Sequence, residues 1–147
     1  MNLLDLYSLE GGAFLDGTAF MYKILEERPL EHGISHREMP TFKDHIEFVN
    51  NKPFRYWYII EYEGSWIGMI ECLPTNEFGV HLLKAYQGKG LGGQAVNLFM
   101  ATHEPLPAIP AVRNGHWLAN CSPFNTAAIQ FFEGLGFHEI QRTLQYD

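Results

Sequence analysis

Gln87-Gly88-Lys89-Gly90-Leu91-Gly92-Gly93 is the stretch from which the rest of this chain can be interpreted. An apolar run, residues 80–83, precedes it, and a helical pattern follows with Leu91, Ala95, Leu98 and Thr102 on one face. A strand, a glycine-rich turn and a helix start together present free backbone N–H groups to an anion, and glycine lets the backbone approach without a Cβ atom. Lys89 adds a positive charge there. The stretch therefore predicts a phosphate-binding loop; an ordinary glycine-rich turn is the alternative.

Two commoner phosphate-binding loops fit this stretch less well. Residues 88–93 match G-x-G-x-x-G, but a dinucleotide-binding fold has this motif at its first strand-to-helix turn, with an acidic residue about 20 positions later. Here the motif lies past the middle of the chain, and a proline-rich segment stands at that distance. No His-Arg-Asp or Asp-Phe-Gly follows, as a protein kinase requires. A P-loop requires Ser or Thr after Gly-Lys, and this chain has Gly90.

The stretch resembles the acyl-CoA loop of the Gcn5-related N-acetyltransferase (GNAT) superfamily, which reads Gln/Arg-x-x-Gly-x-Gly/Ala. Residues 87–92 match it at every fixed position. A second signature of the superfamily is Asn-x-x-Ala at the start of a helix, followed by aromatic-Glu-x-Leu-Gly-Phe. Asn125, Ala128 and residues 132–137 stand at those spacings. The resemblance covers residues 55–147 and, more loosely, the whole chain, as one acyltransferase domain over residues 1–147.

Length and composition are those of one globular domain. The 147 residues are 46% hydrophobic and 18% charged, which is enough to bury a core without disulfides. The net charge of −7 argues against a nucleic-acid or anionic membrane surface. Cys72 and Cys121 have no CxxC partner, so neither a disulfide framework nor a metal site is expected. No signal peptide or membrane span is predicted, and we expect a cytoplasmic monomer or homodimer.

The chain predicts an α/β (α+β) domain with a mixed, mostly antiparallel sheet flanked by about four helices. Thr41 and Asp44 form a capping-box pattern for a helix, and Ser122-Pro123 has the pattern of a helix N-cap followed by proline at the first helical position. The order of the expected strands and helices along the chain matches the superfamily fold, in which strands 4 and 5 splay apart to admit the cofactor. The expected strands are 1–7, 54–62, 65–73, 78–83, 117–120 and 137–146, and the expected helices are 18–27, 41–50, 91–103 and 122–133.

The resemblance implies where acetyl-CoA, the co-substrate, would bind. In the superfamily, backbone N–H groups at the end of the fourth strand contact the pantetheine and the thioester oxygen. Such donors contribute about 3 kcal/mol each in other acyl-transfer enzymes. The glycine loop contacts the pyrophosphate, and no metal ion takes part. The positions that match are Leu82, Leu83, Lys84, Gln87, Gly88, Lys89, Gly90, Leu91, Gly92, Asn125 and Phe132, with Lys84 standing where the family usually has proline.

Three residues on the third and fourth expected strands are candidates for the general base. Superfamily members often use a carboxylate at the start of the fourth strand, and Glu77 is the residue that best matches it. His81 is the second candidate, since histidine changes charge near neutral pH, and Glu71 is the third. A solvated strand-end charge for Glu77 and a histidine packed in the sheet for His81 are the structural alternatives.

Phe132 is a departure from the pattern of the superfamily. Many relatives have a tyrosine here that protonates the departing CoA sulfur, and phenylalanine cannot donate a proton. Tyr86, Cys121 and Ser122 are candidates for the acid by their position in the sequence alone. No enzyme acid is needed if the thiolate leaves unaided, because a thiol with a pKa of about 8.5 is a fair leaving group.

The acceptor is the part of the function about which the sequence indicates least. Residues 26–29, 34–36, 39–41 and 56–58 are similar to small acetyltransferases of sugar biosynthesis, which favours an amino sugar or a nucleotide-linked amino sugar. An amino acid, another small amine or a protein N-terminus remains open as acceptor. So do transfer of another acyl group, transfer to oxygen, and a non-catalytic acyl-CoA-binding module. His32 and His36 lie in a predicted substrate loop, and their i, i+4 spacing lacks the carboxylates of a zinc site.

Overall fold

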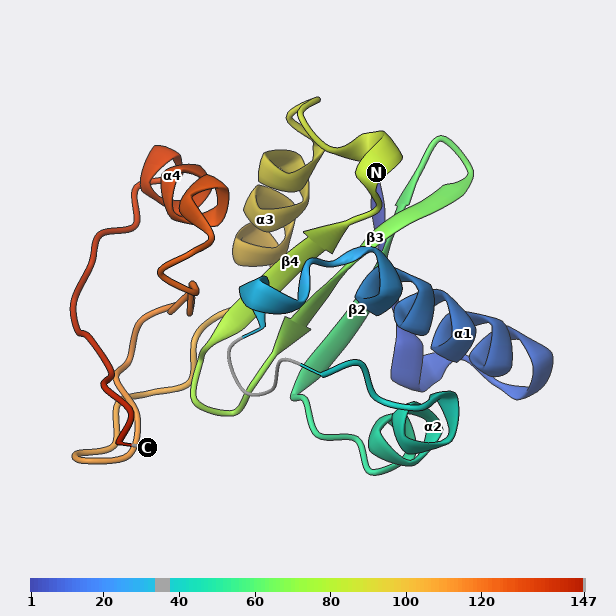
Figure 1. Cartoon of the computed structure of the whole chain (residues 1–147), viewed down its shortest axis with the longest axis horizontal. Coiled ribbons are helices and arrows are strands. Elements are labelled where there is room, and N and C mark those ends of the chain that lie inside the picture. Colours follow the sequence, from blue (N-terminus) through green and yellow to red (C-terminus); the bar gives the residue numbers. More distant parts are fainter. Residues whose placement is uncertain (34–37, 147) are drawn as a thin grey trace.

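The structure is a computed structural model that describes residues 1–33 and 38–146 (Figure 1). Four strands form one sheet in the order β1-β2-β3-β4, and every neighbouring pair is antiparallel. Short 3₁₀ turns, η1 to η3, connect several elements. The predicted fold class is confirmed. The elements are β1 Asn2–Asp5, η1 Leu6–Ser8, α1 Gly11–Glu27, η2 Leu30–His32, α2 Phe42–Asn50, β2 Tyr56–Tyr62, β3 Ser65–Cys72, β4 Phe78–Leu82, η3 Lys84–Tyr86, α3 Leu91–Thr102 and α4 Thr126–Gly134.

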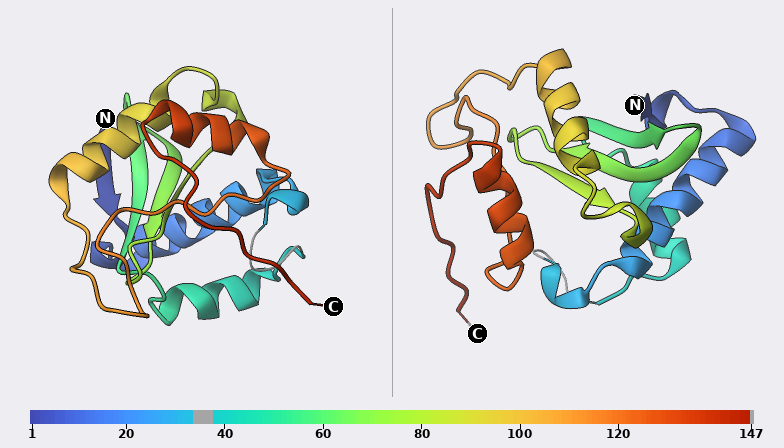
Figure 2. Two further views of the ribbon diagram at one scale, coloured as in Figure 1. Left: turned by 90° about the vertical axis from the view of Figure 1, so that its left-hand side faces the viewer. Right: turned by 90° about the horizontal axis from the view of Figure 1, so that it is seen from above.

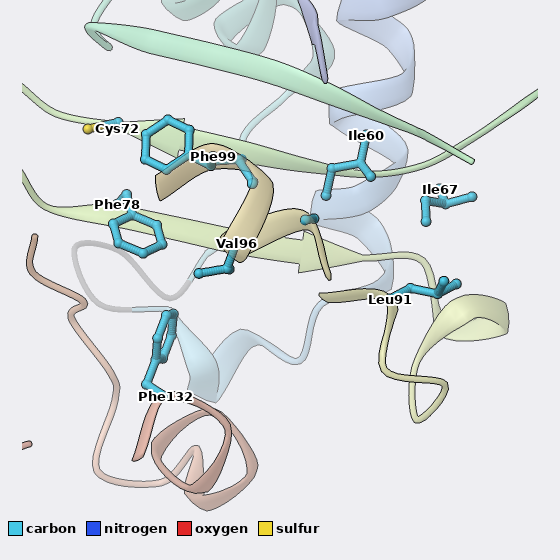
Figure 3. Packing of buried hydrophobic residues seen from close by; sticks show 10 residues of the cluster. Ile60, Ile67, Cys72, Phe78, Leu91, Val96, Phe99 and Phe132 are labelled. Atoms are coloured by element: carbon cyan, nitrogen blue, oxygen red, sulfur yellow. The ribbon is translucent and has the colours of Figure 1, made fainter. Parts of the chain in front are cut away.

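Helices cover both faces of the sheet, as the view from above in Figure 2 shows. Helices α1 and α2 cover one face, where Met21, Ile24 and Val49 pack against strand residues such as Trp57 and Met69. Helices α3 and α4 lie on the other face. Figure 3 shows that core, in which Phe132 of α4 is directed toward Phe78 of β4, with ring centroids 5.9 Å apart. The sheet thus separates two hydrophobic clusters.

Alternation along β4 decides which side chains face which helix layer. Phe78 and Val80 belong to the cluster under α3 and α4, whereas Leu83 belongs to the cluster under α1 and α2. Because successive side chains of a strand point to opposite faces, Glu77, Gly79 and His81 lie on the α1 side. This alternation places the polar candidates on one face and the aromatic core on the other.

Helix α1 begins at Gly11, seven residues before the predicted start at Thr18. Glycines at 11, 12 and 17 weaken the local helical signal, since glycine lowers helix propensity. Packing overrides that preference: a Cβ at position 17 would lie 2.7 Å from Leu6 Cδ1, so glycine allows α1 to approach η1. The capping box of α2 is confirmed, with Thr41 Oγ1 accepting from the Asp44 N–H at 3.1 Å.

The two strands predicted after β4 are not formed. The predicted strand at 117–120 makes an isolated parallel bridge between Leu118 and Glu77, where the Phe78 N–H donates to the Leu118 carbonyl at 2.9 Å. Residues 119 onward then separate from β4, so the two segments of the chain diverge after this single bridge. Residues 138–146 are exposed and irregular. Ile140, Leu144 and Tyr146 of this segment stay exposed, and Arg142 interrupts the strand face that they would share.

Helix α4 begins later than the sequence predicted. Asn125 is its N-cap, with Oδ1 accepting the Ala128 N–H at 3.1 Å. The predicted cap, Ser122, instead donates its hydroxyl to the Glu31 carbonyl at 3.1 Å, which ties the chain to η2. Gly136, which has φ +95°, closes the helix, and the Phe137 N–H donates to the Phe132 carbonyl, as in a Schellman motif. No helix within the described residues is long and apolar enough to cross a membrane.

Candidate active site

One cleft of about 740 Å³ opens where the 117–121 segment separates from β4. We divide its lining into two parts that lie on either side of the β4 edge. The loop half consists of Gln87, Gly88, Gly90, Leu91, Gly92, Gly93, Asn125, Ala127, Ala128, Phe131 and Phe132. The charged half consists of Ile24, Glu27, Arg28, Pro29, His32, Phe54, Glu71, Glu77, Gly79 and His81.

The exposed edge of β4 supplies backbone groups between the two halves. The Leu83 N–H donates to the Ile67 carbonyl of β3 at 2.9 Å, and the Phe78 N–H donates away from β3, to Leu118. Since N–H direction alternates along a strand, the N–H groups of Val80 and Leu82 point to the open edge. Leu82 therefore has the orientation expected of a site residue. Leu83 does not, because its N–H is used in the sheet and its side chain is buried.

The loop half is built on the start of α3. Gly90 is the N-cap with φ +74°, and Gly88 also has a positive φ of +71°. The first helical hydrogen bond is donated by Gln94 to Gly90 at 3.2 Å, so the N–H groups of residues 91–93 have no partner inside the helix. The exposed residues include the glycines at 88 and 90. The predicted arrangement of strand, glycine turn and helix N-terminus is thus present, and it favours an anion.

Three polar groups around the loop are held by the protein itself. Gln87 Nε2 donates to the Leu82 carbonyl at 2.9 Å, which ties the loop to the end of β4. Lys89 Nζ donates to the Ala85 carbonyl at 2.8 Å and does not line the cleft. The Lys84 N–H donates to Glu27 Oε2 at 2.7 Å, which fixes the end of α1 against η3. The structure therefore brings Gln87 and Lys84 to the cleft and turns the Lys89 ammonium away from it.

The far wall of the cleft is formed by α4 and the segment before it. Asn125 lines the cleft while its Oδ1 caps α4, which leaves its amide nitrogen for a ligand. Phe132 is 8% exposed and packs on Phe78, so position 132 faces both core and cleft. Burial raises the pKa of the Cys121 thiol, which keeps this wall residue protonated. Ser122 is buried and bonded to η2.

The charged half contains a hydrogen-bonded pair that crosses from β3 to β4. Glu71 Oε1 lies 2.7 Å from His81 Nε2, and the two side chains are 18% and 23% exposed. The residue opposite Glu71 on β4 is Gly79. A Cβ there would lie 2.6 Å from Glu71 Oε1 and 3.1 Å from His81 Nε2, so the pair occupies space that only glycine leaves open.

Glu77 lies at the other end of β4, beside the bridge to Leu118. Its backbone carbonyl accepts the Leu73 N–H at 2.8 Å, and its side chain lines the cleft on the same strand face as His81. The two residues are four positions apart, which is about 13 Å along a strand. Within residues 1–33 and 38–146, the Glu77 carboxylate makes no hydrogen bond or ion pair. The structure thus brings Glu71 and His81 together and leaves Glu77 apart.

Comparison with known proteins identifies the family of this chain. The profile of the acetyltransferase (GNAT) family matches residues 18–137, which is most of the chain. The chain belongs to the acetyltransferase (GNAT) family. It is therefore an acetyl-CoA-dependent N-acetyltransferase, and the predicted resemblance is confirmed. No curated protein gives a significant match to this acetyltransferase.

Solved structures share the fold of this acetyltransferase at low sequence identity. An acetyltransferase from Thermus thermophilus is 17% identical, with a TM-score of 0.60 over 95% of this chain and 88% of that one. A ribosomal-protein-alanine N-acetyltransferase from Brucella melitensis is also 17% identical, with a TM-score of 0.62 over 96% and 86%. A predicted acetyltransferase with acetyl-CoA from Clostridium acetobutylicum is 13% identical, with a TM-score of 0.57 over 90% and 91%. At these identities the likeness concerns the fold.

Asn76 is a positioning residue of this acetyltransferase that the sequence analysis did not single out. It is fully buried with φ +69°. Its side chain bonds the Leu106 N–H at 2.7 Å and the carbonyls of Leu106 and Asn114 at 2.8 and 2.9 Å, and its own carbonyl accepts from Leu118 at 3.0 Å. Asn76 thus holds the connector and the far wall against β4. Asparagine suits this position because it tolerates a positive φ better than most residues do.

Two further predictions concern metals and the substrate loop. His32 lines the charged half, but His36 lies outside the described residues. Among residues 1–33 and 38–146 there is no group of three or more His, Cys, Asp or Glu side chains that could hold a metal ion.

Proposed function

We propose that this acetyltransferase moves the acetyl group of acetyl-CoA to the primary amine of a small polar molecule by direct attack. The observation that carries the proposal is the cleft itself. A helix start with free N–H groups lies on one side of the β4 edge, and a carboxylate–imidazole pair lies on the other. These are the two requirements of the reaction, since the donor brings phosphates and the acceptor brings an amine that must lose a proton.

On this proposal the loop half binds acetyl-CoA. The N–H groups of residues 91–93 contact the pyrophosphate, and the exposed glycines at 88 and 90 let it approach. The acyl-pantetheine arm follows the edge of β4, where the outward N–H groups of Val80 and Leu82 bond its amide and the thioester oxygen. Asn125 contributes its amide nitrogen from the opposite wall.

The acceptor then occupies the charged half. Its amine nitrogen forms a bond to the thioester carbon, the Leu82 N–H stabilises the oxygen anion, and the C–S bond breaks with its electron pair on sulfur. Glu77 and His81 are the proposed bases. Phe132 supplies no proton, so the sulfur departs as a thiolate or takes a proton from water; the Cys121 thiol, which burial keeps protonated because it raises its pKa, is a donor on the wall.

An amino sugar or nucleotide-linked amino sugar is the proposed acceptor class. Arg28, His32 and Glu27 give the charged half donors and acceptors of both signs, which suits a hydroxylated or phosphorylated amine better than an apolar one. The combined cleft of about 740 Å³ has the size of a small-molecule site.

The test is an amine panel with acetyl-CoA, followed by mass spectrometry of the products. The panel should contain glucosamine, a nucleotide-linked amino sugar, free amino acids, spermidine and an alanine-starting peptide. We expect an acetylated amino sugar, with release of one CoA for each product. Acetylation of the peptide alone would assign the chain to protein N-termini, and acetyl-CoA binding without any product would contradict the proposed small-molecule acceptor.

A further inference from the structure

The Glu71–His81 pair has a geometry that determines which ring nitrogen of His81 is free. Glu71 Oε1 lies 2.7 Å from Nε2, and a carboxylate can only accept a hydrogen bond. The neutral ring therefore carries its proton on Nε2 and its lone pair on Nδ1. No other hydrogen bond of the His81 ring exists among the described residues. Nδ1 is thus left as a base in a residue that lines the cleft.

The second oxygen of Glu71 strengthens this arrangement. Glu71 Oε2 is buried and has no hydrogen-bond partner within the described residues. The carboxylate therefore directs its hydrogen bonding to one neighbour, His81 Nε2. A carboxylate that accepts a hydrogen bond from an imidazole can stabilise positive charge on that ring, because hydrogen bonds between ionised groups are stronger than neutral ones. The imidazolium that forms when His81 takes a proton is the charge that Glu71 is placed to stabilise.

The strand register places His81, rather than Glu77, beside the reacting atoms. His81 is adjacent to Leu82, whose N–H points to the open edge of β4 where the thioester is proposed to bind. Glu77 lies about 13 Å away along the same strand. Gly79 between them has no side chain, and its Cβ position would collide with the pair. The strand thus reserves space for Glu71 and His81 next to the proposed thioester site.

We propose that His81 Nδ1 removes the proton of the acceptor amine and that Glu71 is the positioning residue that fixes its tautomer and stabilises the imidazolium. This deepens the proposed function and rests on it. The amine N–H proton moves to Nδ1 as the nitrogen forms its bond to the thioester carbon. The C–S bond then breaks with its electron pair on sulfur, and His81 returns the proton to water. The same division of roles operates in Ser-His-Asp enzymes.

The tautomer can be tested without knowing the acceptor. Nitrogen NMR of the histidine-labelled protein should show neutral His81 with its proton on Nε2, and His81→Asn assigns the signal by its disappearance. In Glu71→Gln the amide can donate or accept at nearly constant volume, so we expect a mixture of tautomers. A wild-type His81 that carries its proton on Nδ1 would overturn the proposal.

Kinetics with the panel amine that is acetylated fastest tests the catalytic role. We expect His81→Asn to lower kcat/KM by about 10² to 10⁴-fold, with a smaller loss for Glu71→Gln, and both losses should shrink as pH rises because more of the amine is already neutral. Acetyl-CoA affinity by calorimetry should stay unchanged, which shows that the variants are folded and separates this proposal from the loop-half assignment.

Glu77→Gln is the competing variant in the same assay. If His81 is the base, kcat/KM should fall at least about tenfold less in Glu77→Gln than in His81→Asn, because Glu77 lies about 13 Å from His81 along the strand. A loss of 10² to 10⁴-fold in Glu77→Gln with wild-type rates in His81→Asn would overturn the proposal and make Glu77 the base. If the wild-type protein binds acetyl-CoA but acetylates no amine, the proposed acceptor fails, and the NMR tautomer then decides the Glu71–His81 assignment by itself.

Discussion

The two halves of the cleft use different parts of the polypeptide. The loop half consists mainly of backbone groups and small residues, with the free N–H groups at the start of α3 and alanines on α4. The charged half consists of side chains from α1, η2, β3 and β4, which are far apart in the sequence. A backbone site is determined by a local motif, whereas a side-chain site depends on strand register and helix packing. The predictions below test whether the halves act independently.

Gly79→Ala should cause the largest loss of activity, and the loss should come from the charged half alone. The added Cβ would lie 2.6 Å from Glu71 Oε1 and 3.1 Å from His81 Nε2, so the pair must move. A displacement of about 1 Å in a catalytic group can cost about 10²-fold, and we expect a loss of that size in kcat/KM. Calorimetry should show unchanged acetyl-CoA affinity.

Gly134→Ala is the matched control for that change. Its Cβ would meet nothing within 4 Å, and it lies at the end of α4 away from both halves. We expect wild-type kinetics. If Gly79→Ala also showed wild-type kinetics, the pair would not be part of the chemistry.

Gly90→Asp should disrupt the loop half alone, with a loss of more than about tenfold in acetyl-CoA affinity by calorimetry. The substitution adds a negative charge at the N-cap, where φ is +74° and a side chain would find open space. Gly90→Asn is the control, since asparagine tolerates a left-handed conformation and has no charge. An affinity that falls equally in both variants would indicate a conformational cause, and unchanged affinity in Gly90→Asp would contradict the anion site.

Asn125→Ala should have a moderate effect on the loop half. We expect the KM for acetyl-CoA to rise about three- to tenfold, the effect of one lost hydrogen bond, while the KM for the acceptor changes little. The residue also caps α4, so urea unfolding should show a loss of about 1 kcal/mol.

Asn125→Ser separates these two roles, because serine also caps helices. It should restore the stability but not the KM for acetyl-CoA. A change confined to the acceptor KM would place Asn125 on the charged side instead.

The smallest expected effect concerns the rate at which the Cys121 thiol is alkylated. This rate should depend on which half of the cleft holds a ligand. Because burial raises the pKa of this thiol, less thiolate exists at about pH 8 than for a free cysteine, so alkylation by iodoacetamide should be slower and should accelerate as pH rises. Cys72 should not react, since it is fully buried and its pKa is raised to about 11. Acetyl-CoA should slow the labelling of Cys121 more than an amine does. Equal protection by both would show that the halves are not separate.

The contrast between local motifs and distant contacts also explains which predictions the structure confirmed. Capping of α2 by Thr41 and the start of α3 after the glycine turn depend on residues within one turn of each other. The local sequence pattern predicted Ser122 as a helix N-cap, but its hydroxyl instead donates to η2, 91 residues away in the sequence. Likewise, glycines hid the first two turns of α1, because Gly17 is required by contact with Leu6. The role of Asn125 in binding stays a prediction, although its place at the start of α4 follows from local capping.

The sequence by itself determined the loop half of the cleft and the family, because backbone N–H groups at a helix start follow from a glycine motif. Only the tertiary structure decided the charged half. The register of β3 against β4 sets Glu71 opposite Gly79 and within reach of His81, and a shift of one residue would put them on opposite faces. Asn76 likewise acts through three distant segments. Such contacts depend on how the chain folds back on itself, which no local pattern encodes.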